Sequence, residues 1–364
     1  MKIAQVAPLF ERVPPKLYGG TERVVSYLTE ELVRAGHEVT LFASGDSITA
    51  AELVPCSETA LRLNPEVRDG LPYHVLMLEK VLQRADEFDV LHFHTELLHF
   101  PLVRALGHPT VTTLHGRLDQ PDLVPFYNTF RDAPLASISK NQRGPIPGLN
   151  WVGNVHHGLP KNLLPFNPKG DGGYLAFLGR ISPEKGPDLA IRIAVETGQT
   201  LKIAAKIADE DRAYWESDIE PLVRAHSNIE FIGEVSEKQK ADVLGNARAV
   251  LFPISWREPF GLVMIEAMAC GTPVIAFRRG AVAEVMEDGV TGYVVDTVEQ
   301  AVEAVGKLDR LDRAAIRKTF ERRFTAERMA ADYVKVYREL IDGQERQIPP
   351  TDADAALRVV AFRR

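Results

Sequence analysis

The chain has 364 residues, of which 45% are hydrophobic and 26% are charged, and its formal net charge is −7 with an isoelectric point near 5.9. This is the composition of a globular protein, its length predicts two domains, and its scattered basic residues argue against nucleic acid as a partner. No apolar run reaches the ~18–20 residues of a membrane-spanning helix, and residues 2–7 are too short for the hydrophobic region of a signal peptide.

The two cysteines, Cys56 and Cys270, lie far apart in the sequence. We interpret them as reduced core residues of an intracellular protein and not as a disulfide, since stable disulfides are rare in the cytosol. A cytoplasmic location is therefore expected.

The amino-terminal half opens with an apolar strand, a loop and a helix. The loop is rich in proline and glycine and ends in the pair Gly19 and Gly20. Thr21 then stands in the N-cap position of a helix over residues 22–35, whose apolar residues recur at helical spacing. A strand over residues 39–43 completes a Rossmann-like opening, but the G-x-G-x-x-G fingerprint is missing, which argues against a dinucleotide.

A pair of histidines marks the middle of this half. Residues 51–73 are expected to form a loop and a helix, and a further helix is expected over residues 73–85. The strand over residues 88–94 carries His92 and His94 at alternate positions, so both side chains share one face. Two such histidines could bind a metal, but no third ligand is evident, and a structural or substrate-lining role is favoured.

Another histidine stands at a strand end. The strand over residues 110–114 ends at His115, and ligands of open parallel sheets bind beyond the carboxyl ends of the strands. We therefore expect His115 to face a cleft. Segments over residues 135–139 and 152–160 complete the first domain, and the run from 160 to 173, rich in Pro, Gly and Lys, predicts an interdomain linker.

The carboxy-terminal half begins with a second strand, loop and helix. A strand over residues 174–178 runs into a turn that carries Arg180 and Lys185, and a helix over residues 187–196 follows. The fork of an arginine and the point charge of a lysine suit a pyrophosphate at such a turn. The alternative is that both are solvated loop charges.

Two more strands are expected, over residues 201–206 and 229–233. Asp209 and Asp211 follow the first of them in a D-x-D arrangement of a kind that can bind a metal. The start of a helix is favoured instead, because Asp is common there.

The next stretch predicts a parallel βαβ unit. Apolar strands over residues 249–253 and 274–277 flank a helix over residues 262–269, which Gly271 and Pro273 bring to an end. In such units ligands bind where the helix begins.

The amides of Phe260, Gly261 and Leu262 are expected to be unpaired donors at this helix start, where the helix dipole favours a phosphate, and Gly261 would let the ligand approach the backbone. Glu258 precedes them, and Glu266 follows about two helical turns later. This spacing is too long for a paired acid and base but suits a long polyhydroxylated ligand with a central phosphate, which indicates a sugar nucleotide. The alternative is that Glu258 is an N-terminal helix charge and Glu266 a solvated helix residue.

The end of the chain is predicted to be helical over residues 313–341. The tail from Gly343 is polar at first and apolar over residues 355–362. It carries no motif, and packing of the tail on the first domain stays open.

The run from Glu258 to Val274 resembles the signature of the family-4 retaining glycosyltransferases, which have the GT-B fold. It reads E-P-F-G and then, from Glu266, E-A-M-A-C-G-T-P-V. The match is specific, because the glycines and prolines agree as well as the two glutamates. The turn with Arg180 and Lys185 resembles a second motif of this family.

This resemblance implies an α/β protein with two Rossmann-like domains that face a cleft, and a C-terminal helix that crosses back to the first domain. The expected divisions are residues 1–162 for an acceptor domain, 163–325 for a nucleotide-sugar donor domain, and 326–364 for the returning helix and tail. The implied reaction moves a hexose-type sugar from a nucleoside diphosphate sugar to a hydroxyl acceptor, with retention at the anomeric carbon. A UDP-sugar is favoured as donor, and GDP- and ADP-sugars stay open.

The resemblance also implies roles for residues. His115, in a Thr-x-His pattern, would contact the transferred sugar and support catalysis, Glu258 would bind sugar hydroxyls, and Glu266 would bind the ribose. Arg180 and Lys185 would hold the pyrophosphate and stabilise the charge of the leaving group. The remaining donor-binding residues would be Gly19, Gly20, Ile232, Gly233, Pro259, Phe260, Gly261 and Leu262.

The implied scheme requires neither a metal nor a cofactor, because the leaving phosphate itself would help to deprotonate the acceptor. Loops over residues 10–18 and 118–130 are expected to select the acceptor, which could be a sugar, a lipid-linked compound or a small molecule. A lipid acceptor would imply peripheral contact with the inner face of the membrane, although no basic amphipathic helix supports it strongly. A sugar-nucleotide epimerase, a non-catalytic sugar-nucleotide-binding protein and a nicotinamide dehydrogenase stay open as alternatives, the last disfavoured by the missing fingerprint.

Overall fold

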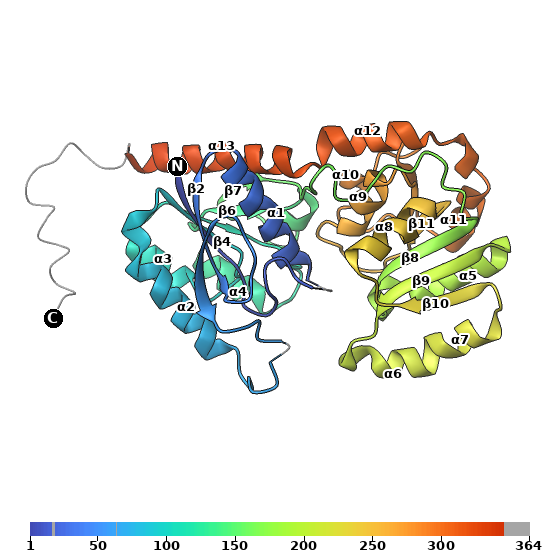
Figure 1. Cartoon of the computed structure of the whole chain (residues 1–364), viewed down its shortest axis with the longest axis horizontal. Helices are drawn as coiled ribbons and strands as arrows, with labels where there is room; N and C mark the ends of the chain where they lie inside the picture. The colour runs from blue at the N-terminus through green and yellow to red at the C-terminus, as the bar shows by residue number, and fades with distance from the viewer. Residues whose placement is uncertain (17–18, 63, 346–364) are drawn as a thin grey trace, which may run out of the picture.

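Two parallel β-sheets with helices around them make up the computed structural model, which describes residues 1–16, 19–62 and 64–345 (Figure 1). The first sheet has the strand order β3-β2-β1-β4-β5-β6-β7, and the second has the order β10-β9-β8-β11-β12-β13. The α/β fold with two Rossmann-like domains that the sequence predicts is confirmed.

The first half of the chain forms the first sheet and its helices. Its strands are β1 (Lys2–Val6), β2 (Glu38–Ser44), β3 (Glu52–Ser57), β4 (Val90–Phe93), β5 (Thr110–Thr113), β6 (Leu135–Ser137) and β7 (Trp151–Asn154). Its α-helices are α1 (Gly20–Arg34), α2 (Leu71–Gln83), α3 (Phe100–Leu106) and α4 (Leu123–Thr129).

The second half forms the second sheet. Its strands are β8 (Tyr174–Arg180), β9 (Thr200–Lys206), β10 (Ile229–Gly233), β11 (Ala249–Phe252), β12 (Val274–Phe277) and β13 (Gly292–Val295). Its α-helices are α5 (Pro187–Thr197), α6 (Arg212–Tyr214), α7 (Glu220–Ala225), α8 (Glu237–Asn246), α9 (Leu262–Ala269), α10 (Val282–Val285), α11 (Val298–Val305) and α12 (Arg313–Arg323), and α13 (Ala326–Glu345) follows.

The βαβ unit around α9 has the bounds that its sequence predicts. All residues of β11 and β12 are buried, as expected for parallel strands that are covered on both faces. Gly261 begins α9 with a φ of 87°, and Gly271 follows its end with a φ of 76°. The apolar runs and the glycines therefore mark the same positions for the strands and the helix of this unit.

Three expectations for the first half are wrong. Strand β3 lies where a loop and a helix were expected, because an edge strand with only one buried residue and a proline gives little strand signal. Helix α1 begins at Gly20 and is capped by Gly19 without a side-chain hydrogen bond, so Thr21 is not the cap. Helix α4 occupies part of the segment that was interpreted as a loop over residues 118–130.

Helix α13 returns from the second domain to the first, as predicted, and runs along one side of the first domain in Figure 1, whereas α12 lies along the second. Its Tyr337 Oη lies 2.7 Å from His92 Nδ1 and accepts a hydrogen bond from Gln5 Nε2 at 3.1 Å. Its Tyr333 Oη lies 2.9 Å from Thr113 Oγ1. The prediction for the tail concerns mainly residues 346–364, which lie outside the described residues.

The two chain segments that connect the domains lie side by side. Leu159 donates its amide hydrogen bond to Phe324 O at 2.9 Å and accepts one from the amide of Ala326 at 2.8 Å. The first sheet ends at Asn154 and the second begins at Tyr174, so Leu159 belongs to the segment that connects them. Phe324 and Ala326 belong to the return connection after the second sheet. The divisions after residues 162 and 325 stay predictions.

A carboxylate of the second domain binds polar groups of the first. Glu284 in α10 accepts hydrogen bonds from the amides of Lys140 at 2.9 Å and Asn141 at 3.1 Å, and it lies 2.8 Å from His156 Nε2. Burial raises the pKa of this carboxyl, but the hydrogen bonds from His156 and the two amides outweigh burial and lower the pKa to about 2.

We predict that Glu284→Gln destabilises the protein at neutral pH by about 1–3 kcal/mol, because an amide cannot satisfy the same donors. The folded pKa of about 2 is lower than the ordinary value of 4.5, so the carboxylate stabilises the fold above pH 4.5 and loses this contribution as the pH falls toward 2. The difference in Tm between wild type and variant should therefore shrink with acidification. Glu303→Gln, an exposed change in α11, serves as the control, and a pH-independent difference would contradict the assignment.

Candidate functional site

A cleft of about 1010 Å³ lies between the two domains and is lined by residues of both. Most of the residues that the sequence singles out line it together. They are Gly19, Gly20, His115, Arg180, Lys185, Glu258, Pro259, Phe260, Gly261, Leu262 and Glu266. Ile232 and Gly233, at the end of β10, are not among the lining residues, whereas the next two residues, Glu234 and Val235, are.

Two helix N-termini meet at this cleft. Helix α1 begins at Gly20 and α9 begins at Leu262, and neither helix has a side-chain cap. A Cβ atom on Gly20 would lie 3.7 Å from Leu262 Cδ1. The uncapped amides of both helices are therefore close together, and both helix dipoles favour an anion there.

Glycine is required at both helix starts. Gly19 has a φ of 155°, and a Cβ atom there would lie 2.8 Å from Pro15 Cβ. Gly261 has a φ of 87°, and a Cβ atom there would lie 2.7 Å from Met264 Cε. Any other residue would have to displace these neighbours, so the backbone conformation at each helix start depends on glycine.

The lysine and the glutamate predicted for the site contact each other. Lys185 Nζ lies 2.6 Å from Glu258 Oε2, and it also lies 4.7 Å from the centre of the Trp256 ring. The side chain of Glu258 is only 11% exposed. Lys185, whose side chain is 21% exposed, is therefore paired and is not a solvated loop charge.

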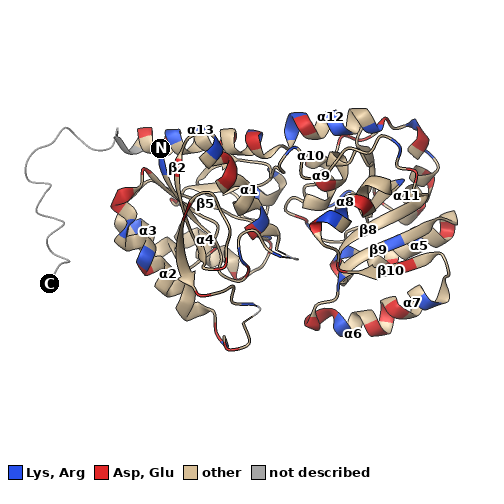
Figure 2. Ribbon diagram, viewed as in Figure 1, with Lys and Arg blue, Asp and Glu red and all other residues tan. Residues whose placement is uncertain are grey.

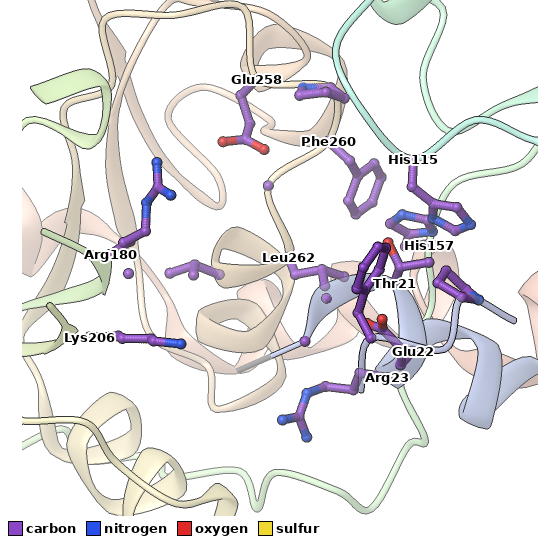
Figure 3. A pocket seen from close by; sticks show the side chains of 18 of the residues that line it. Thr21, Glu22, Arg23, His115, His157, Arg180, Lys206, Glu258, Phe260 and Leu262 are labelled. Atoms are coloured by element: carbon purple, nitrogen blue, oxygen red, sulfur yellow. The ribbon is translucent and has the colours of Figure 1, made fainter. Parts of the chain in front are cut away.

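Arg180 stands among carboxylates at the end of β8. Its guanidinium pairs with Glu184 at 2.7 Å, Glu210 at 3.1 Å and Asp211 at 3.1 Å. Asp211 belongs to the short helical turn that leads into α6, as the favoured interpretation of the D-x-D segment had it. Lys206 ends the neighbouring strand β9 beside Arg180, and Figure 3 shows both cations on the same side of the cleft.

Glu266 is buried and paired, so it is not a solvated helix residue. Its carboxylate lies 2.7 Å from Lys240 Nζ in α8, and Lys240 also lies 3.6 Å from Glu237. Glu237 pairs in turn with Arg23 of α1. This series of ion pairs runs from α9 to the first turn of α1 and so connects the two sides of the cleft.

His115 is held by a chain of hydrogen bonds that starts inside the first domain. Gln5 Oε1 lies 2.7 Å from His94 Nε2, and His94 Nδ1 lies 2.9 Å from His115 Nε2. The ring of His157 stacks on His115 with centroids 5.3 Å apart. Burial lowers the pKa of His115 to about 3, so the imidazole is neutral at physiological pH.

His92 in β4 and His94 just after it have structural and lining roles, respectively. His92 is buried and bonds to Thr113 and Tyr337, while His94 lines the cleft. Over the parts of the chain that are described, no group of three or more His, Cys, Asp or Glu residues is placed to hold a metal ion. Cys56 and Cys270 are buried free thiols.

Sequence reasoning missed several lining residues. Lys206 could have been found, because it ends a parallel strand in the same way as Arg180. Lys240, Arg23 and Trp256 could not, since their roles depend on contacts between segments far apart in sequence. Chemically, the cleft offers cations and helix amides for an anionic group, with carboxylates on either side of it for hydroxyl groups.

Charges are distributed over both domains, and Figure 2 shows no large area of one sign in this view. Among the described helices, none combines the length and the apolar character that crossing a bilayer requires.

Comparison with known proteins identifies two family segments in the chain. The family described as "Glycosyltransferase Family 4" matches residues 18–146, and the family described as "Glycosyl transferases group 1" matches residues 164–319. The two matches correspond to the two sheets.

Relatives match over most of their length. The chain is 36% identical to the D-inositol 3-phosphate glycosyltransferase of Mycolicibacterium smegmatis, over 76% of this chain and 75% of the relative. It is 27% identical to the glycogen synthase of Mycobacterium tuberculosis, over 77% and 79% of the two chains.

Solved structures agree over almost the whole fold. AviGT4, a glycosyltransferase involved in avilamycin A biosynthesis, is 26% identical and superimposes with a TM-score of 0.71 over 94% of this chain and 98% of its own. The Anabaena protein HepE in complex with UDP-glucose is 18% identical, with a TM-score of 0.70 over 95% and 100%. The chain therefore belongs to the family-4, group 1 glycosyltransferases, and it is a glycosyltransferase with the GT-B fold.

Proposed function

We propose that the protein is a retaining glycosyltransferase that moves a hexose-type sugar from a nucleoside diphosphate sugar to a hydroxyl acceptor. The observation that carries this proposal is the meeting of two uncapped helix starts with Arg180 and Lys185 in one cleft. A UDP-sugar is the favoured donor, with GDP- and ADP-sugars as alternatives. HepE, a protein of the same fold, forms a complex with UDP-glucose, which supports a UDP-sugar as the first choice of donor.

The diphosphate would take the place that Glu258 now occupies beside Lys185. Glu258 then becomes available to accept hydrogen bonds from sugar hydroxyls, and Lys185 binds a phosphate oxygen. Glu266, at the far end of the same segment, would accept from the ribose. The neutral ring of His115 would line the sugar subsite on the opposite side.

The reaction breaks the bond between the anomeric carbon and the phosphate oxygen, and the electron pair leaves with the diphosphate. The acceptor oxygen forms the new bond on the same face, which retains the configuration, and its proton passes to an oxygen of the departing phosphate. Arg180, Lys185 and the amides of residues 260–262 would stabilise the negative charge as it develops.

We include no metal in this scheme, since cations of the chain and helix amides can supply the positive charge. A chelator should therefore leave activity unchanged. A cytoplasmic location, where nucleoside diphosphate sugars are made, completes the proposal, with contact at the inner membrane face reserved for a lipid acceptor.

A thermal-shift panel of nucleoside diphosphates and their sugars, with and without a divalent cation, tests the proposed donor site. A ligand that binds only the folded protein raises its Tm, and the rise increases with the ratio of ligand concentration to Kd. Selective stabilisation by one diphosphate without a metal is expected. If none of them stabilises the protein, the cleft is not a donor site.

Glu258→Ala should lower kcat by about 100-fold or more, because a contact to the transferred sugar is lost in the transition state. Its affinity for nucleoside diphosphate should stay within about threefold of wild type or improve, since Lys185 loses a competing carboxylate. Calorimetry and steady-state kinetics measure the two effects, and Glu299→Ala, an exposed change on α11, is the control. A large loss of diphosphate affinity would contradict the sugar contact.

Arg180→Ala combined with Lys185→Ala should weaken nucleoside diphosphate binding by about 10- to 100-fold, because charge-assisted hydrogen bonds to phosphate are lost. Binding of the bare nucleoside should change little. The matched control is Arg192→Ala with Lys307→Ala, two half-exposed cations outside the cleft. Equal losses for nucleoside and diphosphate would place the two cations elsewhere.

A further inference from the structure

The two halves of the cleft differ in their charge. The second domain contributes four cationic lining residues, which are Arg180, Lys185, Lys206 and Lys240, and four carboxylates, which are Glu184, Glu234, Glu258 and Glu266. The first domain contributes Arg23 and Arg62 as its cationic lining residues in the described part of the chain, together with the carboxylates of Glu22, Glu96 and Asp69. Most cations that could bind a diphosphate therefore lie on the second domain, whereas carboxylates outnumber cations among the lining residues of the first domain.

Both arginines of the first domain are already paired. Arg62 Nη1 lies 3.1 Å from Glu11 Oε1, and the side chain of Glu11 is only 8% exposed. Arg23 pairs with Glu237 across the cleft. A phosphate that bound Arg62 would have to displace Glu11, which is not among the lining residues, so a ligand hydroxyl could not replace Arg62 as its partner, and leaving this buried carboxylate unpaired is costly.

Glu22 presents a buried carboxylate at the start of α1. Glu22 is only 6% exposed, yet it lines the cleft. Its Oε2 lies 3.3 Å from the position that a Cβ atom on Gly19 would take. Burial raises the pKa of Glu22 to about 6, and the neighbouring Glu11 also raises it, whereas Arg62 lowers it. At neutral pH this group is a hydrogen-bond acceptor that repels a phosphate.

Glu96 adds a second acceptor near His115. The amide of Gly116 donates to Glu96 Oε1 at 2.8 Å, which fixes the carboxylate at the end of β5 beside His115. Glu22 and Glu96 thus line the first domain's side of one cleft and can both accept hydrogen bonds from hydroxyl groups.

Phe10 and His74 form an aromatic wall on the same side. The Phe10 ring is 45% exposed although it lines the cleft, and its centre lies 4.9 Å from that of His74. His74 is fixed, because its Nε2 accepts from the amide of Leu9 at 3.2 Å and its Nδ1 donates to Gly70 O at 2.8 Å. An exposed aromatic face with a negative quadrupole suits the C–H face of a sugar ring.

From these contacts we infer that the acceptor is an uncharged sugar or polyol, bound by Glu22 and Glu96 through its hydroxyl groups and by Phe10 through its ring, and not a phosphorylated compound. This inference rests on the proposed function and narrows its acceptor. It also distinguishes the chain from its relative, the D-inositol 3-phosphate glycosyltransferase, whose name includes a phosphate.

Matched pairs of acceptors test the inference on the whole chain saturated with its nucleoside diphosphate. Each neutral compound, such as glucose or inositol, is compared with its monophosphate by thermal shift and, with the intact donor, by product mass spectrometry. We expect the neutral member of a pair to bind or react at least about tenfold better. Preference for the monophosphate would overturn the inference, and so would the absence of binding and transfer for every neutral compound.

Two variants locate the effect in the first domain. Glu22→Gln should raise the KM of the neutral acceptor by about tenfold and leave the Kd of the nucleoside diphosphate unchanged or lower it, because a negative charge near the start of α1 is removed, whereas Glu38→Gln, an exposed change on β2, should alter neither. Inorganic phosphate should give the diphosphate-saturated protein no further stabilisation. Stabilisation by phosphate that disappears in Arg62→Ala would overturn the inference. Failure of every nucleoside diphosphate to bind would contradict the proposed function instead.

Discussion

The burial of two tyrosines from α13 in the first domain is the contact on which the arrangement of the cleft depends. Tyr333 and Tyr337 are almost fully buried, and a buried hydroxyl needs a hydrogen-bond partner. Gln5, His92 and Thr113, all on strands of the first sheet, supply these partners. Helix α13, the last described helix, is thus part of the core of the first domain, and the second domain is held beside it.

The same tyrosines are connected to the cleft. Gln5 donates to Tyr337 with its amide nitrogen and faces His94 with its amide oxygen, and His94 contacts His115. The orientation of the cleft histidine is therefore set by a chain of hydrogen bonds that reaches α13. A buried network of this kind holds its members in one arrangement, because each unsatisfied group would be costly.

The donor half of the cleft is prepared in a different way. Lys185 and Arg180 each contact carboxylates of the chain, which keep the cations in place at the helix starts. Phosphate oxygens can replace these carboxylates, since both are oxygen anions of similar geometry. In the proposed donor complex, one set of ion pairs would be exchanged for another, and no free side chains would have to be ordered.

Local sequence patterns predict those structural features that depend on contacts between residues close together in the sequence. The bounds of α9 and β12 followed from glycine and proline punctuation, and most predicted site residues lie in one cleft because strand ends of parallel sheets share an edge. The edge strand β3 and the glycine cap of α1 did not follow, because their signals are weak or conflict with a stronger capping residue nearby. Pairs such as Arg23 with Glu237, or Lys240 with Glu266, depend on packing that no local pattern contains.

The side-by-side connections at Leu159 and Ala326 determine how the domains can move. A single connection would allow the two domains to rotate relative to each other about several axes. Two adjacent connections, joined by hydrogen bonds between Leu159, Phe324 and Ala326, restrict the relative rotation of the domains more than one connection would. Any opening of the cleft would separate the α1 and α9 helix starts, and the paired connections would favour their return to the same facing position on closing.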